Sequence, residues 1–208
     1  MQLIGYLDSP FVRRVAITMQ CLGIEYEHRE LSIFRDFEEF RVINPMVKVP
    51  TLVLDDGRVL IDSSLIIDYL ESQLTRSSLR PDHPQQFVTV LQHVGTAMVA
   101  MEKTAQLIYE TSHRPEQQQY GPWIQRLEQQ LEGAAILMET AVAALQDSSS
   151  MWLVGDTFSQ ADISVAVAWR FILHIDRVNL DPKEFPALMA FSARAEALPA
   201  FLACPLSE

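Results

Sequence analysis

Cysteine is scarce in this sequence, and no segment is apolar enough to cross a membrane. The two cysteines, Cys21 and Cys204, lie near opposite ends of the 208 residues, without the spacing of a metal site or of a Cys-x-x-Cys motif. No run of about 18 apolar residues occurs, and the N-terminal residues lack the basic leader of a signal peptide. His93, His113 and His174 share no spacing typical of metal ligands. We therefore expect a cytoplasmic protein with reduced thiols, no bound metal and no membrane segment.

Basic residues are also in short supply. Lys and Arg number 16 against 27 Asp and Glu, which gives a formal net charge of −11. Nucleic acids and anionic membrane surfaces are bound through basic patches, so this balance argues against both as partners. A local basic pocket for an acidic ligand is still compatible with it. Hydrophobic residues at 49% and charged residues at 21% are typical of an ordinary globular protein.

The first 75 residues have the pattern of a small α/β domain. Ser9 and Pro10 are suited to the N-cap and the first position of a helix, and Gly23 is suited to ending it. The turn signal Asp55-Asp56-Gly57 between two β-branched runs predicts a hairpin. The expected order is βαβαββα, with strands at 3–7, 24–31, 49–53 and 59–61 and helices at 10–22, 34–42 and from 63 onward.

The hairpin and the helix after it carry most of the functional information. Pro50 stands where a strand begins and cannot donate to a sheet, which leaves the backbone of Val49 able to pair with an extended ligand. Asp62-Ser63-Ser64 follows the hairpin and is suited to cap a helix. The N–H groups at such a helix start favour a carboxylate. Together these features predict a site for a small, extended, anionic peptide, although Asp62 and Ser63 could be a plain helix cap.

The rest of the chain is helical in pattern. A polar, proline-containing stretch at residues 76–84 is the one clear linker, and we expect domains at 1–75 and 85–208. The segment at 161–175 is apolar almost all the way round, which is typical of a helix buried in a bundle. The other helical patterns lie at 85–113, 123–145, 186–197 and 199–204.

These features together resemble the cytosolic glutathione transferases, and the resemblance runs from end to end. It rests on four segments in the right order: SPFVRRV at 9–15, NPMVKVPTL at 44–52, DSSLIIDYL at 62–70 and WLVGDTFSQADI at 152–163. In the last of these, Ser159 and Asp162 have the spacing of a capping box, which we interpret as structural. The resemblance implies a thioredoxin-like α/β domain that binds glutathione, followed by an all-helical bundle.

The resemblance also implies roles for individual residues. Pro50 would be cis, with the Val49 backbone pairing to the cysteinyl part of glutathione, and Ser9 would face the thiol. Either Lys48 or Arg35 would bind the glycine carboxylate. The full set of implied contacts is Ser9 as the catalytic residue, with Phe11, Arg35, Lys48, Val49, Pro50, Asp62 and Ser63 for glutathione. Many relatives have glycine at the position of Val47, so either the loop here keeps φ negative or the Lys48 contact is altered.

The chemistry expected of Ser9 is the activation of a thiol. A hydroxyl that donates a hydrogen bond to a thiolate contributes roughly 1.5–3 kcal/mol, which lowers a thiol pKa by about one or two units. The positive end of the helix adds to this effect. The segment Ser9-Pro10-Phe11-Val12 contains no cysteine, so we expect no dithiol redox chemistry at this position. The alternative is that Ser9 serves only as a helix cap.

The second substrate is expected between the two domains, where such pockets commonly form. Methionine suits an adaptable, unselective pocket, although the same side chains could be ordinary core. The candidate pocket residues are Tyr6, Met98, Met101 and Tyr109.

Three functions fit this sequence. The leading hypothesis is a homodimeric glutathione S-transferase that uses glutathione as co-substrate, without a cofactor, against small apolar electrophiles. A second is a regulatory or binding protein that keeps the fold without turnover. A third is a glutathione-dependent peroxidase or isomerase, although Asp8-Ser9-Pro10 lacks the Ser-Ser-Cys usual in the isomerases of this family.

Overall fold

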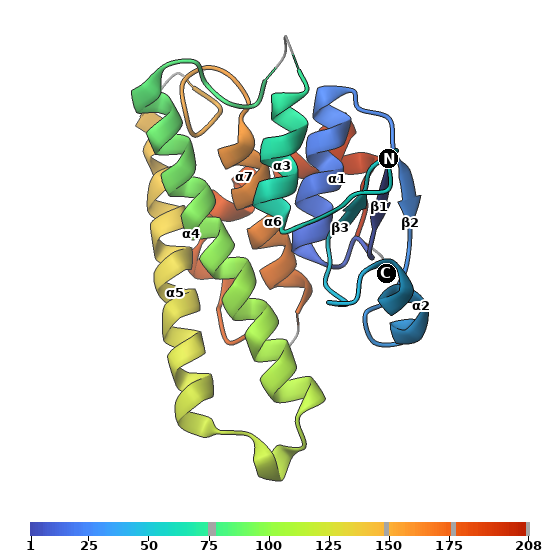
Figure 1. The fold of residues 1–208 in the computed structure, drawn as a ribbon. Coiled ribbons are helices and arrows are strands. Elements are labelled where there is room, and N and C mark those ends of the chain that lie inside the picture. Colours follow the sequence, from blue (N-terminus) through green and yellow to red (C-terminus); the bar gives the residue numbers. More distant parts are fainter. Residues whose placement is uncertain (75–77, 148–149, 176–177, 207–208) are drawn as a thin grey trace. The chain divides into compact units, whose positions relative to one another are not determined.

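The chain forms two compact units. The computed structural model describes residues 1–74, 78–147, 150–175 and 178–206 (Figure 1). One unit comprises Met1–Leu79 together with Leu198–Glu208, and the other comprises Arg80–Ala197. The expected second domain, 85–208, therefore ends too late, because the last segment packs with the first unit. We call these unit 1 and unit 2.

Unit 1 is built on a four-stranded sheet. Its strands are β1 (Gln2–Ile4), β2 (Glu27–Arg29), β3 (Thr51–Val53) and β4 (Val59–Ile61). The spatial order is β2-β1-β3-β4, with β1 parallel to β2 and β3 antiparallel to both β1 and β4. Leu3, Ile4 and Leu52 are fully buried, and because neighbouring residues of a strand face opposite sides, both faces of the central strands are covered.

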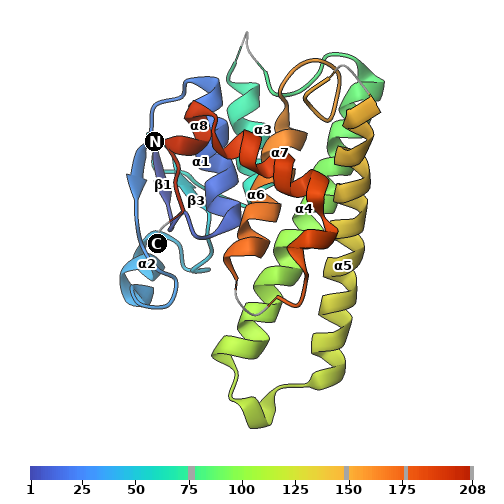
Figure 2. The same ribbon diagram turned by 180° about the vertical axis from the view of Figure 1, so that it is seen from behind.

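Helices pack on this sheet in the expected order. They are α1 (Pro10–Leu22), α2 (Phe37–Ile43), α3 (Ser63–Ser72) and the short α8 (Pro199–Leu202). Helices α1 and α3 lie side by side in Figure 1, and α8 lies against α1 in Figure 2. Gly23, at φ 66°, ends α1 as the sequence predicts.

Several elements of unit 1, among them two strands and one helix, are shorter than the sequence predicts. Strands β1 and β2 are each 3 residues long. The helix expected from residue 34 starts at Phe37, because Ser32 and Asp36 form a tight turn before it. The Asp36 carboxylate accepts the Ser32 N–H at 2.8 Å, and the Ser32 hydroxyl accepts the N–H groups of Phe34 and Arg35 at 3.2 and 3.1 Å. These side chains give the backbone an alternative to the helix.

Unit 2 is helical. Its long helices are α4 (Pro84–Ile108), α5 (Gly121–Ala143), α6 (Gln160–His174) and α7 (Pro186–Glu196). Helix α4 packs against α5 and α6, and α7 packs against both α5 and α6 (Figure 1). Helix α6 is buried almost throughout, as its sequence predicts. The expected fold class, an α/β domain followed by an all-helical domain, is confirmed.

Helix α4 is shorter than the apolar pattern suggests. It gives way to a π-helical turn, Tyr109–His113. Within this turn lies Glu110, a buried residue whose carboxylate accepts hydrogen bonds from the Arg114 guanidinium at 2.9 Å and the Tyr120 N–H at 2.9 Å. A buried carboxylate needs such partners, and these two bonds connect the turn to the residues that lead into α5.

The expected linker is partly held to unit 1. Residues 75–77 lie outside the described part of the chain. Beyond them, the Glu71 carboxylate of α3 accepts the Ser78 hydroxyl at 2.5 Å and the Leu79 N–H at 3.0 Å. Helix α4 then begins at Pro84, where a nitrogen of His83 accepts the Gln85 N–H at 3.3 Å. None of the helices in the described ranges is both long and apolar enough to cross a membrane.

Candidate active site

Ser9 occupies the N-cap position of α1 but does not cap the helix. Pro10 is the first helical residue, as expected, and the Ser9 N–H donates to the Tyr6 carbonyl at 3.2 Å. Among the residues that the structure describes, the Ser9 hydroxyl makes no capping hydrogen bond. By contrast, Ser159 and Asp62 both accept backbone N–H groups at the starts of their helices. Ser9 is half-buried.

The loop before β3 has the expected cis peptide bond, between Val49 and Pro50. Asn44 lies at the centre of this loop: its buried amide donates to the Thr51 hydroxyl at 2.9 Å. The Thr51 hydroxyl in turn donates to the Lys48 carbonyl at 2.6 Å. This network fixes the backbone on both sides of Pro50.

Val47 has a positive φ, which is unusual for a valine. Its φ is 46°, so the alternative in which the loop keeps φ negative is wrong. A β-branched side chain is disfavoured there. Val47 packs against the buried cluster of Ile4, Leu31 and Phe40, and this burial offsets the unfavourable backbone conformation. The loop therefore keeps the shape that glycine would give it.

Gly5, at the end of β1, connects the sheet to the loop before β3. Its N–H donates to the Arg29 carbonyl at 3.1 Å, and its carbonyl lies 2.8 Å from His28 Nε2. Its φ is 129°, and an added Cβ would lie 2.7 Å from Val12 Cγ2 and 2.7 Å from Val49 Cγ1. Only glycine permits this approach. The first turn of α1 and the residue before Pro50 therefore meet at Gly5.

Replacing Gly5 with alanine should damage both stability and ligand binding. The methyl group would displace Val12 and Val49 at a backbone angle that alanine resists, a combination expected to cost about 2–4 kcal/mol. We expect a lower melting temperature and weaker glutathione binding by calorimetry. Gly57→Ala is the matched control, because Gly57 also has positive φ, at 84°, but nothing lies within 4 Å of its added Cβ. Equal losses in the two variants would contradict a role for the Val49 contact.

The start of α3 holds the third part of the candidate site. The Asp62 carboxylate accepts the N–H groups of Ser64 and Leu65 at 2.8 and 3.4 Å, so it caps α3. Ser63 is 1% exposed and Ser64 is half-buried. Both hydroxyls accept hydrogen bonds from Arg14, at 3.0 and 3.1 Å. A ligand therefore reaches Ser64 more readily than the predicted Ser63.

Arg35 and Tyr6, predicted for different substrates, lie against one another. The guanidinium carbon of Arg35 is 5.3 Å from the centroid of the Tyr6 ring. Since the Tyr6 carbonyl accepts the Ser9 N–H, this pair is close to the start of α1. Lys48 is exposed on the neighbouring loop. Which cation binds the glycine carboxylate stays a prediction, as does the contact expected of Phe11, which is half-buried at the second position of α1.

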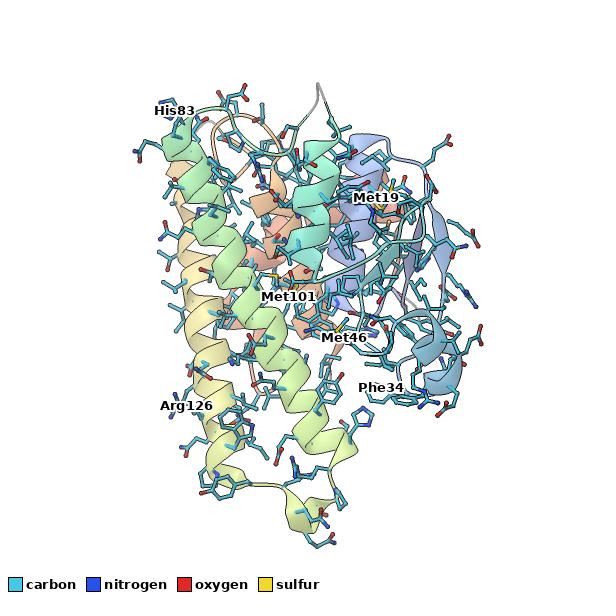
Figure 3. All side chains as sticks on the ribbon, viewed as in Figure 1. Met19, Phe34, Met46, His83, Met101 and Arg126 are labelled. Carbon is cyan, nitrogen blue, oxygen red and sulfur yellow. The ribbon has the colours of Figure 1, made fainter. Side chains whose placement is uncertain are left out.

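The other predicted pocket residues belong to unit 2. Met98 and Met101 are on α4, and Tyr109 opens the π-helical turn. Met101 is labelled in Figure 3. Met101 is fully buried, whereas Tyr109 is 47% exposed and lies 5.7 Å, between ring centroids, from His113. Their role toward an electrophile stays a prediction. In the described ranges, no group of three or more His, Cys, Asp or Glu side chains is arranged to hold a metal ion.

The two cysteines, far apart in the sequence, belong to the same unit. Burial raises the pKa of Cys21 to about 11, and it also raises the pKa of Cys204. The Cys204 sulfur lies 4.0 Å from the Tyr26 hydroxyl, whose own pKa burial raises to about 12. Thiols that resist ionisation are poor nucleophiles, which supports the prediction that both cysteines are inert.

The sequence analysis missed Gly5, Asn44 and Arg14. Nothing local singles out Gly5 or Asn44, since their partners lie across the sheet or loop. Arg14 did leave a signal: two adjacent arginines, Arg13 and Arg14, interrupt the apolar spacing of α1 on faces that should be buried.

Comparisons with known proteins agree with this architecture. The family model "Glutathione S-transferase, N-terminal domain" matches residues 3–78, and "Glutathione S-transferase, C-terminal domain" matches residues 98–199. A maleylacetoacetate isomerase of Rattus norvegicus is 27% identical over 96% of this chain and 89% of its own.

Two solved structures share the fold. A glutathione S-transferase of Methylobacterium radiotolerans, in complex with glutathione sulfonate, has a TM-score of 0.88 at 24% identity, covering 100% of this chain and 95% of its own. A glutathione transferase family member of Pseudomonas fluorescens, with bound glutathione, has a TM-score of 0.83 at 25% identity, covering 100% of this chain and 99% of its own. With both family models matched in order along the chain, this protein belongs to the glutathione S-transferase family.

Proposed function

We propose that this protein binds glutathione in unit 1 and activates its thiol at Ser9 for attack on small apolar electrophiles. The observation that carries the proposal is the state of Ser9: it stands at the start of α1, yet its hydroxyl is not used to cap the helix. A hydroxyl in that place can donate to a thiolate, which the positive end of the helix also stabilises.

The remaining parts of the site have the chemistry that a tripeptide requires. The Val49 backbone, beside Pro50, can pair with the cysteinyl residue. The start of α3 offers the Asp62 carboxylate to an ammonium group and the serine hydroxyls to a carboxylate. Lys48 and Arg35 are the cations available to the glycine carboxylate. In each case the described contacts either orient the group that would bind glutathione or leave that group accessible.

The direct test is to combine the purified protein with glutathione and a chloronitroaromatic acceptor. We expect enzyme-dependent release of chloride and stoichiometric consumption of glutathione. Calorimetry with glutathione alone distinguishes the non-catalytic alternative. Binding without turnover would favour a regulatory protein, and absence of binding would overturn the proposal.

A second candidate reaction, cis–trans isomerisation, is favoured by the relative named maleylacetoacetate isomerase. A thiolate can add to a conjugated double bond, allow rotation about the resulting single bond and leave again, so that glutathione is regenerated. The same Ser9 would stabilise the departing thiolate. With a cis-configured conjugated acid as substrate, isomerisation with glutathione unchanged would support this reaction, whereas a stable thioether adduct would support transfer.

We also propose that the protein is a homodimer. Large apolar side chains are exposed on both units: Met46 and Leu65 on unit 1, and Val88, Leu91 and Val99 along α4 of unit 2. Two-fold dimers are the commonest solution for covering such surfaces. Light scattering at micromolar concentration should give twice the chain mass of 23.6 kDa. A monomeric mass would contradict this proposal, and Leu91→Glu should convert a dimer into monomers.

A further inference from the structure

Helix α1 carries two adjacent arginines, Arg13 and Arg14, and each is 1% exposed. The other buried side chains of this helix are apolar, apart from Thr18. Taking a charge out of water is costly unless polar partners surround it. Each arginine therefore needs polar partners that offset the cost of burying its charge. The two arginines have different partners.

Arg13 binds the end of the chain. Its Nε donates to the Cys204 carbonyl at 2.8 Å, and its guanidinium carbon lies 5.7 Å from the centroid of the Phe201 ring. These contacts hold α8 on α1 (Figure 2). Arg13 therefore has a structural function within unit 1.

Arg14 points to the start of α3 instead. One of its terminal nitrogens donates to the hydroxyls of both Ser63 and Ser64, at 3.0 and 3.1 Å. Burial lowers the pKa of this guanidinium to about 10, while the nearby Asp62 carboxylate acts in the opposite direction. The group is thus a cation at neutral pH, held behind two serines and one carboxylate.

This arrangement fixes which way the serine hydroxyls act. A hydroxyl has one hydrogen to donate, and accepting from a guanidinium turns that hydrogen away from the arginine. Ser64 is half-buried and can present its hydrogen outward. The Asp62 carboxylate is oriented in the same turn by the N–H groups of Ser64 and Leu65. An O–H donor and an anionic acceptor side by side complement the carboxylate and ammonium of an α-amino acid.

We propose that Arg14 is a positioning residue for the γ-glutamyl end of glutathione. It holds the Ser64 hydroxyl as a donor toward the ligand carboxylate, with the buried Ser63 hydroxyl as its other acceptor, and it touches neither the thiol nor the reacting atoms. This inference rests on the proposed function, because it assigns part of the glutathione site. The two neighbouring arginines would therefore have different roles: Arg13 binds the end of the chain, and Arg14 contributes to the selection of the ligand.

The test compares Arg14→Met with Arg13→Met, using glutathione and cysteinylglycine as alternative thiols. Cysteinylglycine lacks the γ-glutamyl group, so it reports the site without the contact in question. Arg14→Met should raise the KM and Kd for glutathione by about 10- to 100-fold, the range expected when a charge-assisted hydrogen-bond network is lost. Values for cysteinylglycine should change by less than about threefold. Arg13→Met should lower the melting temperature while keeping the wild-type preference for glutathione over cysteinylglycine.

The outcomes separate this inference from the proposed function. If the wild type does not prefer glutathione over cysteinylglycine, the glutathione site itself is wrong. If the wild type prefers glutathione and Arg14→Met keeps the same preference, only the role of Arg14 is overturned. Should Arg14→Met fail to fold, Arg14→Gln decides, because it keeps a polar side chain at this buried position but removes the cation and shortens its reach to the two hydroxyls. An unchanged preference in Arg14→Gln would overturn the inference, and a loss of about threefold or more would support it.

Discussion

Replacing Ser9 with alanine should lower kcat/KM for glutathione conjugation by about 10- to 100-fold. The reason is that a hydrogen bond to a charged acceptor contributes about 1.5–3 kcal/mol, and here the acceptor is the thiolate. The pKa of bound glutathione should rise by about one to two units, because the hydroxyl favours only the ionised form. The measurement is kcat/KM across pH, together with ultraviolet absorbance of the thiolate in the binary complex.

Ser9→Gly is the matched control for helix capping. Glycine starts helices almost as well as serine but has no hydroxyl. If Ser9 activates the thiol, the glycine and alanine variants should lose activity equally. Because the hydroxyl makes no capping bond, the stability of Ser9→Ala should change by less than about 0.5 kcal/mol. Full activity in Ser9→Ala, with a loss of stability that glycine restores, would instead make Ser9 a plain cap.

Replacing Asp162 with alanine should be the most damaging of these substitutions for stability. One carboxylate oxygen accepts the Leu153 N–H at 2.8 Å, and the other accepts the N–H and hydroxyl of Ser159, each at 2.8 Å. Asp162 is fully buried, and burial raises the pKa of this carboxyl despite those bonds. Alanine would leave the two buried donors of Ser159 and the half-buried Leu153 N–H without their acceptor, at a cost of about 3–5 kcal/mol. We expect the melting temperature to fall by about 10 °C.

Asp181→Ala provides the comparison for this prediction. Asp181 also accepts a backbone N–H, from Lys183 at 3.0 Å, but it is exposed. Its loss should lower stability by less than about 1 kcal/mol, because water can replace the carboxylate. Thermal melts followed by circular dichroism compare the two directly. A loss in Asp162→Ala no greater than in Asp181→Ala would show that the buried network is not needed.

The parts of the fold that the sequence predicts well depend on local signals. Helix α1 begins at Pro10 and ends before Gly23 because a proline and a glycine fit those two positions. The hairpin turns at Asp55-Asp56-Gly57, where the structure has a turn between β3 and β4. Asp62 caps α3 as expected. Each of these follows from residues within a few positions of each other.

What the sequence could not predict depends on partners far along the chain. Val47 takes a positive φ that its side chain disfavours, because a cluster from other elements buries it. Glycine is needed at position 5 because the backbone there lies close to the side chain of Val49, which is 44 positions later in the sequence. The role of Arg14 becomes visible only when α3 lies beside α1. Local propensity contains no information about such contacts, so the sequence predicts candidate ligand-facing residues but not the residues that support them.

The return of residues 198–206 to unit 1 makes that unit discontinuous in sequence, with residues 80–197 inserted between its two pieces. A fragment that stops at Leu79 would lack Phe201, which is buried, and would leave Arg13 without the carbonyl of Cys204. Cutting the chain at its apparent domain boundary would therefore remove part of the glutathione-binding half along with the helical one. An excised unit needs both pieces, rejoined by a short polar bridge in place of the insert.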